Sequence, residues 1–366
     1  MKRTKPFFWF LLLFAVGCFI GFLSISMIPE SFFEDPFSLL VLILLWPVAA
    51  LPTLLHEAGH LVFGLISGYR FVSFRVGSLT LVRGKGKLFF VRRKLQGTGG
   101  QCLMSPPDRA EHPVLLYMYG GVIFNFISFV IALVVFLLTD IVTLRILLAF
   151  FGFVSLFSAI INGIPVKPFG IPNDGFNAKQ LSRDPVVRRA VDLQLLINEA
   201  AENGITIDQM PKEWFDLPPK EALTDPQVIA TLIYRGSYLG ACGDNDGMAD
   251  VFRYALSLPD LLPIHRLSVK AGLFNYIILY QNADPLQLSG TDFSELLHYI
   301  GMRGNPDVST AAYAYHALVR GDLDSAHDAW NDFDRVIRNY PEGLRITAQR
   351  DMAEIQNKVR SVFGQV

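Results

Sequence analysis

Four long apolar stretches without a charged side chain occupy the first half of this 366-residue chain. They run from Phe7 to Pro29, from Phe37 to Leu55, from Pro113 to Thr139 and from Ile146 to Val166. A helix needs roughly 20 mostly apolar residues to cross a bilayer, and helices in soluble cores rarely reach this length without charge. We therefore predict four transmembrane helices. The first, within residues 1–36, has too long an apolar run for a signal peptide, so we expect it to stay uncleaved.

The charges divide the chain into two parts. Residues 1–184 carry 16 of the 32 Lys and Arg but only 9 of the 33 Asp and Glu, a net charge of +7. Residues 185–366 carry a net charge of −8. Nine basic side chains lie in residues 70–110 against the single Asp108. Because basic loops stay on the cytoplasmic side, we predict a multi-pass protein of the cell membrane with its N-terminus and C-terminal region in the cytoplasm.

Residues 71–95 follow a different pattern from the apolar stretches. Apolar and polar residues alternate along Phe71–Gly77 and Ser78–Arg83, and Gly-Lys-Gly at 84–86 interrupts the alternation before Lys87–Arg92. Alternation with period two is typical of strands, and paired glycines are typical of turns. We predict two or three short β-strands. The alternative is an irregular basic loop lying on anionic lipid head groups.

The chain after Asp184 has the pattern of a soluble helical region broken by prolines. Two segments, Leu239–Asp246 and Leu318–Asp324, place Gly-Asp-x-Asp between stretches of helical periodicity. The glycine is suited to ending one helix and the aspartate to capping the next. Ser309–Pro341 resembles one hairpin of a tetratricopeptide (TPR) repeat. We predict an all-α, TPR-like soluble domain over 184–366, with an irregular helical bundle as the alternative.

The most informative short motif is His56-Glu57-Ala58-Gly59-His60. Histidines at i and i+4 lie on one helix face, where both imidazoles reach one zinc ion and the glutamate lies beside it. Zinc lowers the pKa of a bound water from about 15.7 to about 7, and Glu57 is placed to accept the proton. Ionisable residues at membrane depth cost about 2.5–3.5 kcal/mol each and are usually functional. A polar helix end reaching the membrane interface is the alternative.

A zinc site of this kind needs a third protein ligand. Phe63 and Ile66 stand where a metzincin would have its next glycine and histidine, which excludes that class. Asp174 follows the fourth apolar stretch and is predicted on the same side of the membrane as the end of the motif. Gly175 beside it allows a close turn. Asp174 is therefore our candidate for the third ligand, with a solvated Asp-Gly turn as the alternative.

Three motifs in this order resemble the site-2 protease family (M50) of intramembrane zinc metalloproteases. They are His56–His60, Gly120-Gly121-x-x-x-Asn125, and Asn162-Gly-Ile-Pro165 followed by Asp174-Gly175. The resemblance covers roughly residues 37–182, and the family also places membrane-associated β-strands after its first core helix. Val122 replaces the family's usual proline, and the spacing from Asn162 to Asp174 is longer than the compact form.

The resemblance implies a role for each matched residue. His56, His60 and Asp174 would hold Zn²⁺, Glu57 would act as catalytic base and acid, and Asn125 would steady the substrate chain, as a substrate-binding residue, or line the site. The implied organisation is a transmembrane helix and its flanks at 1–36, a protease core at 37–183, and the helical domain at 184–366.

The predicted function is therefore hydrolysis of peptide bonds in single-span membrane proteins or membrane-bound peptide precursors. The family suggests anti-sigma factors, signal-peptide remnants and peptide pheromones as substrates. We expect a lipid bilayer around the spans, a cytoplasmic protein or peptide regulator on the helical domain, and no nucleic acid partner. The alternative is a catalytically inactive membrane scaffold whose helical domain binds a regulatory partner, although the retained Glu57 argues against it. A transporter is disfavoured because four spans show no inverted repeat.

Overall fold

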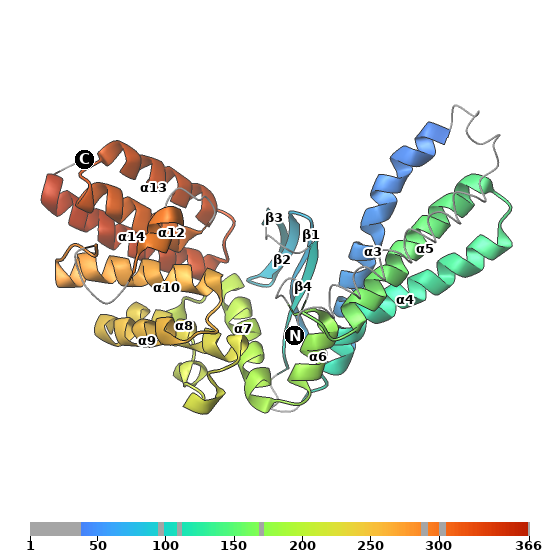
Figure 1. The fold of residues 1–366 in the computed structure, drawn as a ribbon, viewed down its shortest axis with the longest axis horizontal. Helices are drawn as coiled ribbons and strands as arrows, with labels where there is room; N and C mark the ends of the chain where they lie inside the picture. The colour runs from blue at the N-terminus through green and yellow to red at the C-terminus, as the bar shows by residue number, and fades with distance from the viewer. Residues whose placement is uncertain are drawn as a thin grey trace, which may run out of the picture. The chain divides into compact units, whose positions relative to one another are not determined.

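The computed structural model describes residues 38–93, 99–107, 112–167, 172–286, 292–299 and 305–364. Helices predominate, together with one small antiparallel sheet (Figure 1). The chain divides into two compact units, which we describe separately. The first contains residues up to 81 and residues 94–185, and the second contains residues 82–93 and 186–366. The second unit thus includes a short segment from within the sequence of the first.

Three helices of the first unit are long and apolar enough to cross a membrane: α3 (Ser38–Ile66), α4 (Leu115–Leu138) and α5 (Val142–Gly163). They pack against one another (Figure 1). The predicted span at Phe7–Pro29 lies outside the described residues, so three of the four predicted spans are found, not four. Membrane character is therefore supported for the described part of the chain.

Two of these helices differ from the predicted stretches at their ends. α3 continues past Leu55 to Ile66, so the HExxH motif lies inside the helix and not at its end. α5 begins at Val142 and takes in Arg145, whose guanidinium lies 5.0 Å from the centre of the Phe136 ring. The predicted start at Ile146 is therefore too late, because a single charge near a helix end can be accommodated over an aromatic face.

The sheet has four strands in the order β3-β2-β1-β4, with bounds β1 Arg70–Val76, β2 Leu79–Gly84, β3 Lys87–Arg92 and β4 Gly100–Ser105. Lys85 and Gly86 both have positive φ, as in the tight turns that join hairpin strands. The prediction of two or three short strands with a turn at 84–86 is confirmed by β1, β2 and β3, and the alternative of an irregular loop is wrong. The sequence analysis missed β4, which pairs antiparallel with β1 and places Phe74 opposite Cys102.

A small apolar cluster connects the sheet to the helices of the first unit. Tyr69, Cys102, Met104 and Tyr117 are buried together, with Leu61 of α3 packed against them. A methyl group at Gly64 would lie 2.2 Å from the Met104 sulfur, so this glycine lets β4 lie close to α3. The sheet is thereby held next to the half of α3 that carries the HExxH motif.

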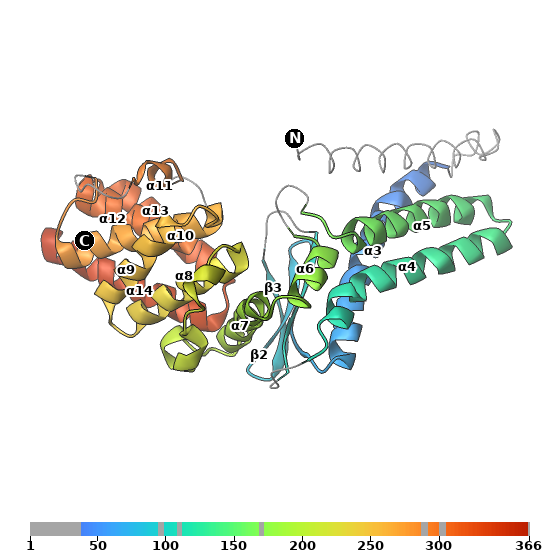
Figure 2. The ribbon, with the colours of Figure 1, turned by 60° about the horizontal axis from the view of Figure 1, so that its bottom comes forward.

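The second unit consists mainly of helices, which gather in one bundle in both views (Figures 1 and 2). Its α-helices are α7 Pro185–Glu202, α8 Pro226–Ala241, α9 Asn245–Ser257, α10 Pro263–Tyr276, α11 Ser294–Tyr299, α12 Pro306–Ala314, α13 Leu323–Ile337 and α14 Glu342–Phe363. The first turns of α8, α10 and α12 each contain a proline, where a missing N–H costs nothing. An all-α C-terminal region is therefore supported.

The two Gly-Asp-x-Asp segments join consecutive helices as predicted. Gly243 and Gly321 have φ values of +87° and +66°. Asp244 caps α9 by accepting a hydrogen bond from the Gly247 N–H, and Asp322 caps α13 by accepting one from the Ser325 N–H. Both helix pairs, α8 with α9 and α12 with α13, pack as hairpins, in the manner that suggested a TPR-like repeat.

Candidate metal centre

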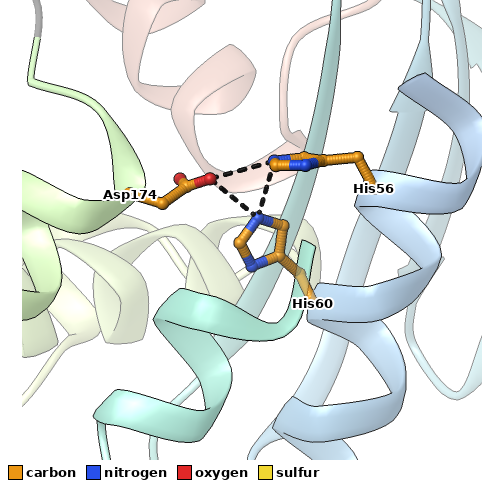
Figure 3. Close-up of side chains that lie close together, drawn as sticks. All are labelled: His56, His60 and Asp174. Carbon is orange, nitrogen blue, oxygen red and sulfur yellow. Dashed lines mark hydrogen bonds and ion pairs between the residues drawn. The ribbon is translucent and has the colours of Figure 1, made fainter. Parts of the chain in front are cut away.

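Three possible metal ligands from two distant segments meet in the first unit (Figure 3). His56 and His60 lie one turn apart on α3, and Asp174 is the first residue of the short helix α6 (Asp174–Leu181). His56 Nε2 lies 2.9 Å and His60 Nε2 lies 3.4 Å from Asp174 Oδ2, and the two Nε2 atoms are 3.2 Å apart. The structure thus brings together all three residues that the sequence analysis selected as ligands.

These separations suit a tetrahedral metal ion. With zinc–ligand bonds of about 2.0–2.2 Å, neighbouring ligand atoms of a tetrahedron lie about 3.3–3.6 Å apart. The three atoms therefore approach the corners of one tetrahedral face, and small side-chain shifts bring them onto it. Two imidazoles and one carboxylate are a donor set that zinc accepts, with the fourth position left for water or substrate.

The environment of His60 fixes which ring nitrogen faces the other ligands. Its Nδ1 lies 2.7 Å from the backbone carbonyl oxygen of Tyr117, which can only accept a hydrogen bond. Nδ1 therefore carries the proton, and Nε2 keeps its lone pair, as a metal ligand requires. The carbonyl group also holds the plane of the ring.

Asn125 lies against the other histidine. Its side-chain amide is fully buried on α4, with Nδ2 3.1 Å from His56 Nδ1 and 2.8 Å from the Ser158 hydroxyl of α5. The resemblance implies that this residue steadies the substrate chain or lines the site, and the structure places it beside a ring of the ligand set.

Glycines make room for the histidines where α3 crosses α4. A methyl group at Gly120 would lie 2.5 Å from the Gly59 carbonyl oxygen, so the two backbones are in direct contact. A methyl group at Gly121 would lie 2.6 Å from His56 Nε2. The Gly-Gly pair of the second motif therefore has two separate steric functions, one toward the α3 backbone and one toward a ligand.

Asn173 places Asp174 by tying the start of α6 to the end of α5. Its Oδ1 accepts hydrogen bonds from the N–H groups of Phe176 and Val166, at 2.9 and 3.2 Å. Its Nδ2 donates to the carbonyl groups of Ile161 and Ile164. The sequence analysis missed this residue, although an asparagine just before a helix start is a common N-cap.

Gly175 is needed for a different reason from the one predicted. It lies within α6 and not in a special turn conformation. A methyl group there would lie 2.3 Å from the Gly163 carbonyl oxygen. The glycine therefore permits α6 to approach the end of α5 closely.

The carboxyl of Asp174 is held in its charged form. Burial alone would raise its pKa, but the hydrogen bond with the His56 imidazole and the closeness of the His60 imidazole outweigh burial and hold the pKa well below its usual range. A carboxylate is the form that binds a cation, so no proton has to leave Asp174 when a metal enters near neutral pH.

The Glu57 side chain extends from α3 toward the edge strand β4. Its carboxylate receives a hydrogen bond from the Cys102 backbone N–H, and a methyl group at Gly100 would lie 2.6 Å from Glu57 Oε1. Arg75 of β1 is buried nearby and donates to the carbonyl oxygens of Gly77 and Gly100, at 2.7 and 3.2 Å. β4 and Arg75 were not predicted, because neither belongs to a sequence motif or to a periodic pattern.

Comparisons with protein-family models, with curated proteins and with solved structures found no match to this chain.

Proposed function

We propose that this chain is an intramembrane zinc metalloprotease that works in the manner of the site-2 protease family. The observation that carries the proposal is the meeting of His56, His60 and Asp174 beside Glu57. Their donor atoms have the spacing of a tetrahedral site, and two of them belong to a helix able to cross a membrane. Glu57 adds a buried carboxylate near enough to interact electrostatically with all three of these residues, as a proton acceptor for metal-bound water would.

The reaction we propose is hydrolysis of a peptide bond at membrane depth. A zinc ion held by the three ligands would act as a Lewis acid toward the peptide carbonyl and toward water. Glu57 would accept the proton of the attacking water and pass it to the leaving amine. The Cys102 N–H would hold the Glu57 carboxylate beside β4 in both steps, and the missing side chain of Gly100 leaves room for it.

The substrate class follows from the position of the ligands on a candidate membrane span. A helical substrate hides its carbonyl groups in its own hydrogen bonds, so it must unwind before cleavage. β4 is an edge strand of the sheet and lies beside Glu57, which supports pairing of an unwound substrate with its main chain. We propose single-span membrane proteins or membrane-bound peptide precursors as substrates, with the basic sheet region and the helical unit in the cytoplasm.

The test compares the wild type with Glu57→Gln, purified as full chains in detergent. We expect about one zinc ion per chain in both, and cleavage of short single-span peptides by the wild type alone. Asp250→Asn is the matched control, because that carboxylate is exposed on α9, and it should cleave like the wild type. Absence of zinc from the wild type, or equal cleavage by Glu57→Gln, would contradict the proposal and favour a membrane scaffold.

A further inference from the structure

We infer that Asn125 is a positioning residue whose amide oxygen holds the His56 ring with Nε2 facing the metal. The inference rests on the metal site proposed above and gives Asn125 a role other than substrate contact. The two nitrogens of the His56 imidazole face different partners, Asp174 at Nε2 and Asn125 at Nδ1.

His56 Nε2 is the atom that belongs to the ligand set, since it lies 2.9 Å from Asp174 Oδ2 and 3.2 Å from His60 Nε2. A neutral imidazole carries one proton. When Nε2 offers its lone pair to a metal, that proton must be on Nδ1, which then needs a hydrogen-bond acceptor. The group facing Nδ1 is the Asn125 amide, 3.1 Å away.

The amide presents its nitrogen to Nδ1 in the structure, an arrangement that fits the tautomer of His56 with its proton on Nε2. There, Nε2–H can donate to Asp174 Oδ2 and the Asn125 NH₂ can donate to Nδ1. Metal binding reverses both requirements. Rotation of the amide by 180° then brings Oδ1 to Nδ1–H, and the oxygen and nitrogen of an amide exchange places with almost no change in shape.

The surrounding groups accept this rotation. Asn125 Oδ1 is buried without a hydrogen-bond partner among the described residues, so turning it away breaks no bond. In its new place, Oδ1 would also face the Ser158 hydroxyl, which can donate to it while accepting from Asn162 Nδ2 at 3.3 Å. After the rotation, Nδ2 occupies the former place of Oδ1, so each orientation leaves one atom of the amide without a hydrogen-bond partner among the described residues. The orientation is therefore set by His56, whose Nε2 must keep its lone pair in order to bind a metal.

Asparagine is suited to this position because it can serve either tautomer of His56. Leucine has a similar size but no polar atom, whereas aspartate accepts hydrogen bonds with both oxygens. Outer partners that orient a ligating histidine typically change metal affinity by 10- to 100-fold when removed. The two substitutions therefore have opposite expected effects.

The experiment measures zinc affinity of the full chain in detergent by competition with a chromophoric chelator. We expect Asn125→Leu to bind zinc about 10- to 100-fold more weakly, and Asn125→Asp to bind it at least as tightly as the wild type. Ser155→Ala is the matched control, because this buried serine on α5 has no hydrogen-bond partner among the described residues, and its affinity should not change.

Three outcomes separate the possibilities. Wild-type affinity in Asn125→Leu, with a raised KM for peptide cleavage, overturns the inference and assigns Asn125 to the substrate. If Asn125→Leu does not fold, as judged by circular dichroism, Asn125→Asp decides, and weaker zinc binding by that variant overturns the inference. A wild type without zinc overturns the proposed function, and the inference with it.

Discussion

The His56 ring occupies the space where a side chain of residue 121 would lie. Because the ring is buried between α3 and α4 and is held by Asn125 and Asp174, it cannot turn aside without leaving the ligand set. At the scale of single residues, the site therefore depends on an absent side chain as much as on the residues that would bind metal.

Gly121→Ala is expected to weaken zinc binding by about 5- to 150-fold, because the added methyl group would lie 2.6 Å from His56 Nε2. Overpacking of this kind typically costs 1–3 kcal/mol. Chelator competition measures the loss. Gly152→Ala is the control, since a methyl group there meets its nearest neighbour, Ala132 Cβ, at an ordinary 3.5 Å. Equal affinities in the two variants would show that the ring has room to move.

Strand β3 and the end of β2 are held by the helices of the second unit. Arg93 forms two hydrogen bonds with the Glu202 carboxylate of α7, and both side chains are largely buried. Arg93 Nε also donates to the Asn339 carbonyl oxygen. A second pair, Lys85 with Glu342, joins the same segments at the surface at 3.0 Å. At the scale of elements, residues 82–93 are thus tied to α7 and α14 within the second unit.

Glu202→Ala is expected to lower the free energy of unfolding by about 3–5 kcal/mol, because it leaves the Arg93 charge buried without its partner. Lys85→Ala should cost only about 0–1 kcal/mol, since an exposed pair is weakened by solvent. Denaturant titration of the full chain in detergent measures both. Equal losses would mean that burial does not distinguish the two pairs.

At the scale of the whole molecule, the two halves of the sequence differ in charge, with +7 over residues 1–184 and −8 over residues 185–366. The apolar helices α3, α4 and α5 all belong to the first unit, and the acidic residues concentrate after residue 184. On the positive-inside rule, we propose that the second unit lies in the cytoplasm. The chain offers a natural reporter of that side, because Cys242 is exposed whereas Cys102 is buried.

A thiol reagent that cannot cross membranes is therefore expected to label Cys242 only after cells are permeabilised. Cys242→Ser is the control that shows how much of the labelling belongs to this thiol. Full labelling of intact cells would place the second unit outside and reverse the proposed topology.

The sequence by itself determined the features that depend on neighbouring residues. Apolar stretches of sufficient length predicted the three candidate membrane helices of the described chain. Alternation predicted β1, β2 and β3, and the Gly-Asp pairs at 243–244 and 321–322 predicted the helix ends and caps there. The i, i+4 spacing of His56 and His60 placed both imidazoles on one face of α3, because helix geometry fixes that relation locally.

Only the tertiary structure decided how distant segments meet. Asp174 reaches His56 across 118 positions because Asn173 ties α6 to the end of α5 and Gly175 lets it approach. The same applies to β4, to Arg75 and to the contact between Asn125 and His56, none of which has a periodic signal. These contacts arise from packing between elements, and the free energy of packing depends on the shape of both surfaces, which no local pattern in the sequence records.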